Sequence, residues 1–204
     1  FLAMRQRSIS IQQQLNPESN IEGCTKDAVD QALAIMLPQG GDINPENYIL
    51  YQNNKVAYLC YNKNYYQACV NQKPIYLVHL QDEITSFIQP KIEECFSKLT
   101  ADLEKKRYSI SQGALKVETK ILPSRIEVDI NKKFDTSNNQ ETKKYDKFAI
   151  RKLSPLFDLA NIAREIANQE SKYCNFDYLG YMMSYPRSDI DKKYPLTDFI
   201  LPKF

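Results

Sequence analysis

The residues with the greatest chemical potential in this sequence are five cysteines and one histidine. The histidine is His79, and the cysteines are Cys24, Cys60, Cys69, Cys95 and Cys174. Thiolates and an imidazole can bind zinc, and a thiolate next to an imidazole can act as a nucleophile. Structural zinc sites usually contain closely spaced Cys-x-x-Cys pairs, which this sequence lacks, and it offers only one histidine. We therefore predict no metal site.

His79 lies among Tyr76, Leu77, Val78 and Leu80, just where a long helical pattern begins. This setting is typical of a histidine with a structural role. The sequence contains no Gly-rich phosphate loop, no nucleophile-elbow motif and no zinc-protease motif. We predict no catalytic residues and no cofactor. The competing hypothesis is an enzyme whose pocket brings His79 together with Cys69 or Cys174.

The cysteine count leaves two interpretations open. Five buried thiols would suit a reducing cytosol. Two disulfides with one cysteine left over would suit an oxidising compartment. Cys60 and Cys69 bracket a short polar loop that a disulfide could close. Cys24 and Cys95 each lie on the apolar stripe of a predicted helix, so packing of the two helices could bring them within bonding distance.

The overall charge places limits on binding partners. The 204 residues include 27 basic and 25 acidic side chains, which give a net charge of +2. This balance is too even to provide a strong general attraction to nucleic acid, and we predict no nucleic-acid partner.

Two long amphipathic helices are predicted. Residues 77–107 carry apolar side chains at helical spacing, and Pro90 is expected to kink or split this helix. Asn16 and Pro17 are typical of a helix start, and Pro38 followed by Gly40 and Gly41 predicts the end of that helix. Each helix has one apolar stripe that needs a partner layer.

Tyrosine is unusually frequent, with fourteen residues and no tryptophan. A predicted hairpin, residues 48–52 and 55–61 around Asn53 and Asn54, precedes a tyrosine-bearing loop at 62–73. Tyrosine combines a large contact area with a polar tip, which suits protein interfaces. Our interface candidates are Tyr58, Tyr61, Tyr65 and Tyr66.

Strict alternation predicts an antiparallel sheet in the second half of the chain. Apolar and charged residues alternate at 115–121 and again at 125–130, with a turn at Pro123 and Ser124. A polar loop is expected at 135–142, followed by a return strand around Phe148. Two helices should follow, one after Ser154 and a shorter one after Asn175. We expect the dry face of the sheet to pack on these later helices in an α+β layer structure.

Both chain ends carry apolar residues. Phe1 to Met4 precede Arg5 and Arg7, so residues 1–15 are interpreted as the end of an N-terminal anchor helix and a stalk, or as a frayed terminus. A membrane span needs about 20 apolar residues, and only four are present. Residues 16–204 are interpreted as one α+β extracellular domain that is truncated at its C-terminus.

Several motifs in sequence order resemble one family. They are Cys24 with the Pro38–Gly41 helix end, the Val56–Leu59 strand, Cys95, and residues 168–170 leading to 173–177. Together they are similar to an uncharacterised family of secreted or surface proteins from small-genome, host-dependent (DPANN-type) archaea. Asp42 and Ile43 depart from the aromatic–aliphatic pair expected after Gly-Gly. No activity is assigned to the family, so no functional residue is carried over.

The resemblance implies an N-terminal membrane anchor, a stalk and an extracellular domain, and it favours disulfides over free thiols. The resulting hypothesis is a non-enzymatic cell-surface protein that binds a protein partner or assembles with copies of itself. A pilin-like filament subunit is the alternative from the structural class. An enzyme with a cysteine or carboxylate site is the third hypothesis.

Overall fold

The computed structural model describes residues 16–64, 66–138 and 141–184. The helices are α1 (Pro17–Met36), the short 3₁₀ helix η1 (Leu37–Gln39), α2 (Tyr76–Lys105), α3 (Leu156–Tyr173) and α4 (Tyr178–Ser184). The strands are β1 (Tyr48–Tyr51), β2 (Asn54–Ala57), β3 (Cys60–Tyr61), β4 (Val70–Asn71), β5 (Ser109–Gln112), β6 (Lys116–Leu122), β7 (Arg125–Ser137) and β8 (Thr142–Leu153). The predicted α+β fold is confirmed.

The ends of α1 form as the sequence predicts. The Asn16 side chain accepts a hydrogen bond of 3.0 Å from the backbone N–H of Glu18, and Pro17 occupies the first turn. Gly40 and Gly41 both adopt positive φ angles, 72° and 93°, and end the segment that follows the helix.

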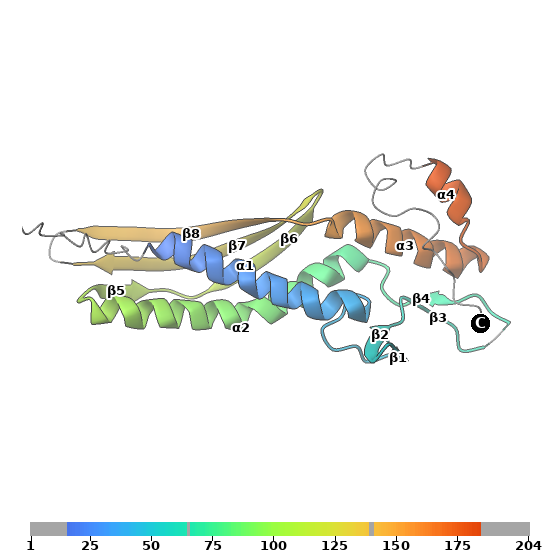
Figure 1. The fold of residues 1–204 in the computed structure, drawn as a ribbon, viewed down its shortest axis with the longest axis horizontal. Helices are drawn as coiled ribbons and strands as arrows, with labels where there is room; N and C mark the ends of the chain where they lie inside the picture. The colour runs from blue at the N-terminus through green and yellow to red at the C-terminus, as the bar shows by residue number, and fades with distance from the viewer. Residues whose placement is uncertain (1–15, 65, 139–140, 185–204) are drawn as a thin grey trace, which may run out of the picture.

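Helix α2 is continuous over 30 residues, with Pro90 inside it. Of the two outcomes predicted for Pro90, a kink or a split, the split is therefore wrong. The helix lies antiparallel against α1, and the pair forms one layer of the molecule (Figure 1).

In the main sheet, the long strand β7 pairs with all three other strands. Strand β6 pairs with residues 125–131 of β7 and β5 pairs with residues 134–137, while β8 pairs with β7 along most of its length. All neighbouring strands are antiparallel. The predicted turn at Pro123 and Ser124 joins β6 to β7. The predicted polar loop at 135–142 is wrong in its bounds, because β7 continues to Ser137 and β8 begins at Thr142. Strand β5 was not predicted.

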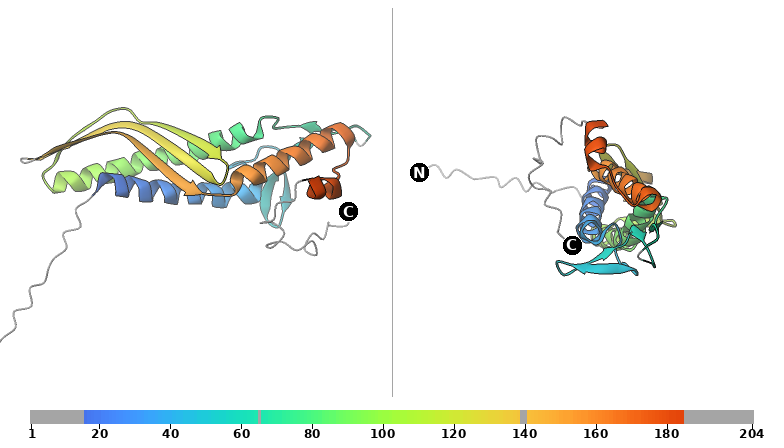
Figure 2. Two further views of the ribbon diagram at one scale, coloured as in Figure 1. Left: turned by 90° about the horizontal axis from the view of Figure 1, so that it is seen from above. Right: turned by 90° about the vertical axis from the view of Figure 1, so that its right-hand side faces the viewer.

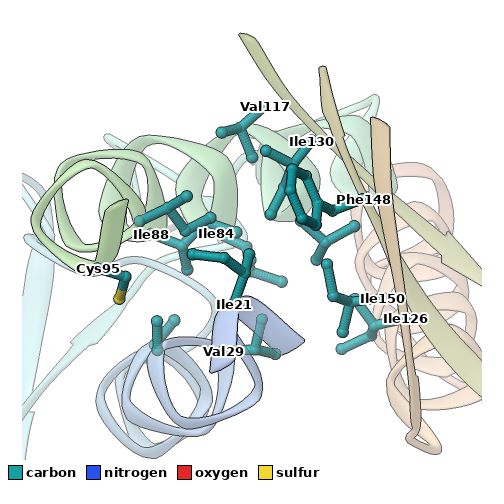
Figure 3. Close-up of a cluster of buried hydrophobic side chains, with 14 of the residues drawn as sticks. Ile21, Val29, Ile84, Ile88, Cys95, Val117, Ile126, Ile130, Phe148 and Ile150 are labelled. Carbon is teal, nitrogen blue, oxygen red and sulfur yellow. The ribbon is translucent and has the colours of Figure 1, made fainter. Parts of the chain in front are cut away.

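The sheet packs its dry face on α1 and α2, rather than on the later helices as we expected (Figure 2). Helix α3 instead follows β8 beyond the end of the sheet, where it contacts α2 and β4. Helices α1 and α2 bury seven and nine residues, whereas α3 buries only three. Figure 3 shows Ile21, Val29, Ile84 and Ile88 of the helices facing Ile130, Phe148 and Ile150 of the sheet.

The opposite face of the sheet carries charged side chains in cross-strand pairs. Glu127 of β7 accepts a hydrogen bond of 2.8 Å from Arg125 of the same strand and forms an ion pair of 3.1 Å with Arg151 of the neighbouring strand β8. Asp129 lies 2.9 Å from Lys147, and this hydrogen bond holds the pKa of Asp129 below its usual range. The alternation of dry and wet faces is therefore as the sequence predicts.

No helix among the described residues is long and apolar enough to cross a membrane. The proposed anchor residues Phe1 to Met4 and the remainder of the stalk to residue 15 lie outside the described part of the chain.

Candidate functional site

The 39 residues that connect α1 and α2 form an excursion at one end of the molecule, away from β5 (Figure 1). The excursion consists of η1, two small two-stranded sheets and the loops between them. We call β1 with β2 the hairpin, and residues 60–71 the disulfide loop. These two units hold most of the residues that we considered as interface candidates.

The hairpin is exposed along its first strand, whereas Val56 and Ala57 of β2 are partly or fully buried. Its first strand, β1, has the sequence Tyr-Ile-Leu-Tyr, and all four side chains are exposed, including Ile49 at 52% and Leu50 at 69%. Strand β1 pairs only with β2, so its other edge has no strand partner within the described residues. An exposed, uncharged edge strand is a common place for another chain to add a strand.

The hairpin turn differs from its prediction by one residue. Gln52 and Asn53 occupy the turn with φ angles of 46° and 64°, whereas Asn53 and Asn54 were expected there. The predicted second strand, 55–61, is also divided. Strand β2 ends at Ala57, and Cys60–Tyr61 pair instead with Val70–Asn71.

Cys60 and Cys69 form a disulfide that closes the disulfide loop, with Cα atoms 5.4 Å apart. Tyr66 at its tip is 84% exposed, and Tyr61 and Val70 are exposed beside it. Tyr58 is half-buried, and its ring lies 5.3 Å from that of Tyr61. Tyr65, the remaining interface candidate, lies outside the described residues.

The loop is attached to α3 by a side-chain hydrogen bond. The Asn71 amide donates to the Asn168 Oδ1 atom at 2.9 Å, and the Asn71 Oδ1 atom accepts from the backbone N–H of Lys73. These contacts fix the orientation of the disulfide loop relative to the helices, so its exposed tyrosine faces solvent from a defined position.

A polar cluster lies at the base of the excursion and contains the single histidine. The His79 Nε2 atom is 2.6 Å from Asp42 Oδ1 and 2.9 Å from Lys73 Nζ. Lys73 also forms an ion pair with the same Asp42 oxygen. The side chains of Asp42 and Lys73 are only 12% and 16% exposed. His79 therefore has a charged environment, although its sequence neighbours suggested a purely apolar one.

Tyr76 packs beside this cluster. Its hydroxyl donates a hydrogen bond of 3.1 Å to the carbonyl oxygen of Gly40, and its ring stacks near His79. Burial, together with the negative charge of Asp42, raises the pKa of Tyr76 to about 12. On the next turn of α2, the Glu83 carboxylate accepts a hydrogen bond of 2.8 Å from the backbone N–H of Ile43.

The structure does not bring His79 together with a free thiol. Cys69 is bonded to Cys60, and Cys24 of α1 is bonded to Cys95 of α2. Cys174 is a free thiol at the exposed end of α3, whereas His79 contacts Asp42, Lys73 and Tyr76.

An open hollow lies between α3 and α4. Its lining includes Glu165, Tyr173, Asn175, Asp177 and Tyr181, and it contains neither His79 nor a cysteine. Among the described residues, no group of three or more histidine, cysteine or carboxylate side chains is arranged to hold a metal ion.

No protein-family model, curated protein or solved structure matches this chain. The candidate site is therefore defined by its own geometry. The sequence of β1 does contain a signal for this site. It has four large uncharged residues in a row, so neither face of the strand carries charged side chains suited to contact with solvent. The cluster around His79 had no such signal, since Asp42 and His79 are 37 residues apart.

Proposed function

We propose that this protein is a membrane-anchored, extracytoplasmic surface protein whose α+β domain associates with copies of itself through the hairpin. The observation that carries the proposal is the exposure of all four β1 side chains together with the unpaired edge of that strand.

Water is a poor environment for such a strand. Large apolar side chains on both faces of an edge strand lose stabilisation unless another chain covers them, and the free backbone groups of the edge can pair with an added strand. Natural proteins usually protect such edges with charged residues or proline, and β1 contains neither.

The strand that adds to the free edge of β1 can be β1 of a second copy of the protein. In an antiparallel pair related by two-fold symmetry, Tyr48 would face Tyr51 of the second copy and Ile49 would face its Leu50. Aromatic residues then oppose aromatic residues and aliphatic residues oppose aliphatic ones, which is a favourable arrangement across paired strands. No like charges oppose each other in this register.

Four residues form a small contact, well below the interface of about 800 Å² per partner that supports a stable isolated dimer. Anchoring both copies to one membrane would raise their effective concentration and allow such a weak contact to act. The proposal therefore joins the hairpin to the anchor that the family resemblance implies.

Two disulfides are compatible with an extracellular location, because such bonds persist in oxidising compartments. The resemblance to archaeal surface proteins supports the same placement. The exposed Tyr61 and Tyr66 of the disulfide loop lie at the same end of the molecule and would widen the contact.

The test is sedimentation velocity of the whole chain in detergent or attached to vesicles over a wide concentration range. The expected result is reversible dimerisation that Ile49→Lys with Leu50→Lys abolishes, because two charges on each edge strand would repel. Leu153→Lys is the matched control: Leu153 is 85% exposed but lies at the end of β8, so its substitution should leave association unchanged.

Self-association would be excluded if the chain stayed monomeric on vesicles at all densities, or if the Ile49 and Leu50 variant associated as the natural chain does. Circular dichroism and retention of both disulfides would establish that the variants are folded.

A further inference from the structure

The polar cluster joins the two ends of the excursion. Asp42 precedes the excursion's strands, and Lys73 follows them at a sequence separation of 31. Their side chains meet each other and contact the first turn of α2 through His79. The excursion is thus closed at its base by one lysine–aspartate pair.

An amine and a carboxyl group are the two partners of an amide bond. In water they exist as ammonium and carboxylate, which do not react. Direct contact between the two groups holds them in the geometry from which they can condense. Both Asp42 and Lys73 are largely buried, and Asp42 lies close enough to Tyr76 for its charge to act on the Tyr76 hydroxyl.

His79 lies where proton transfer would be needed. Its Nε2 atom is within hydrogen-bond distance of both Lys73 Nζ and Asp42 Oδ1, at 2.9 and 2.6 Å. Imidazole can accept a proton from one atom and donate it to another near neutral pH. Glu83, which faces the cluster from the next turn of α2, is engaged by the backbone N–H of Ile43.

We propose that Lys73 and Asp42 condense to an intramolecular isopeptide bond, with His79 as the catalytic proton-transfer residue. A proton first passes from the Lys73 ammonium to the Asp42 carboxylate. The neutral amine then attacks Cγ of the carboxylic acid, and a bond forms between Nζ and Cγ. His79 takes a proton from Nζ and delivers it to the departing oxygen. The Cγ–O bond breaks, and one water molecule leaves.

The reaction needs no further reactant, because an ammonium and a carboxylate together supply every atom of the amide and the water. Its product would hold residues 42 and 73 together covalently around the Cys60–Cys69 disulfide. The hairpin would then be presented from a base that cannot open.

Other lysine–aspartate pairs in the structure lack these features. Lys147 and Asp129 are 2.9 Å apart, but the lysine side chain is 54% exposed. Lys152 and Asp30 are 2.8 Å apart, but the Asp30 side chain is 58% exposed. Neither pair can have a histidine beside it, since His79 is the only one in the sequence and contacts Asp42.

The test is the intact mass of the natively folded full chain after complete reduction and denaturation. The expected mass is one water molecule below that calculated from the sequence, and fragmentation should yield a branched peptide that joins Asp42 to Lys73. Lys73→Arg and Asp42→Ala should have their full calculated masses. His79→Ala should also retain its water while keeping both disulfides.

Two controls separate the proposed bond from other losses of water. Lys147→Arg should still lose one water, because the Lys147–Asp129 pair takes no part. Asp42→Asn should release ammonia instead of water and reach the same final mass as the natural protein. These readouts concern the base of the excursion and are independent of self-association.

A full calculated mass for the folded natural protein would overturn the proposal, whatever the variants do. So would a loss of water that persists in Lys73→Arg, since that would indicate a succinimide or a bond at another site.

Discussion

Cys24 in α1 and Cys95 in α2 form a disulfide that joins the two long helices, with Cα atoms 6.5 Å apart and a sequence separation of 71. Cys95 is buried and Cys24 partly buried against the core, and Figure 3 shows Cys95 next to α1, farther from the sheet than Ile84 and Ile88. It therefore connects the first helix directly to the helix around which the core is built.

Removing this bond should lower the free energy of unfolding substantially. Replacing both Cys24 and Cys95 by serine should reduce it by about 3 to 4 kcal/mol, because the unfolded chain regains the freedom of a long loop. Urea unfolding of the natural and double-serine proteins measures the difference. Cys174→Ser is the control and should have no effect, since Cys174 is an exposed free thiol. Equal stability of all three proteins would contradict the prediction.

Gly41 should tolerate no larger residue. Its φ angle is 93°, and a Cβ atom there would lie 2.5 Å from the Tyr76 hydroxyl and 2.6 Å from Leu80 Cδ2. We expect Gly41→Ala to lower the free energy of unfolding by about 2 kcal/mol, through backbone strain and overpacking. Thermal unfolding followed by circular dichroism measures this loss.

Gly23 provides the opposite case for that experiment. It lies within α1, and a Cβ atom there would meet nothing within 4 Å. Gly23→Ala should therefore raise the free energy of unfolding by about 0.5 to 1 kcal/mol, because alanine favours the helix. If both glycine variants changed stability in the same direction, the assignment of Gly41 to a strained turn would be wrong.

The helices and the centre of the sheet could be predicted from sequence, because their periodicities are local. The alternation at 115–121 and 125–130 matches β6 and the first half of β7. Strand β5, with the sequence Ser-Ile-Ser-Gln, carries too few apolar residues to indicate a strand. It forms because β7 extends beyond Asn131 and offers an edge with which it can pair.

The polar cluster and the packing of the sheet could not be predicted, because both depend on contacts between distant segments. His79, Asp42 and Lys73 meet only after α1 and α2 have packed and the excursion has folded back. Which helices cover the sheet likewise depends on how much apolar surface each helix can bury against it. The pattern of a single segment shows that a helix has an apolar face, but not which partner that face contacts.

Thr25 should be a site where a simple substitution stabilises the protein. Its side chain is fully buried, and its Oγ1 atom has no hydrogen-bond partner among the described residues. Thr25→Val keeps the shape and removes the unsatisfied hydroxyl, so we expect the free energy of unfolding to rise by about 1 kcal/mol. Urea unfolding measures this gain.

Thr85 is the matched control for Thr25, because its Oγ1 atom donates a hydrogen bond of 2.7 Å to the Gln81 carbonyl oxygen. Thr85→Val should give no comparable gain. A loss of stability in Thr25→Val would mean that the hydroxyl is satisfied in solution, and the prediction would fail.

Tyr76 should make the protein less stable at high pH. Its pKa is about 12 in the folded protein, against 10.0 for an ordinary tyrosine, chiefly because burial disfavours the phenolate. The folded state therefore keeps this proton where the unfolded state loses it. The contribution is fully present below pH 10 and is lost as the pH rises towards 12; a shift of this size corresponds to about 2 to 3 kcal/mol.

Urea unfolding across this pH range should show the decline, and Tyr76→Phe, which cannot ionise, should show a smaller decline. Tyrosinate absorbance of the folded protein should show a late-ionising tyrosine that is lost in Tyr76→Phe, whereas Tyr145, whose pKa burial also raises, remains in both proteins. If the natural protein and Tyr76→Phe declined equally, Tyr76 could not be the group responsible.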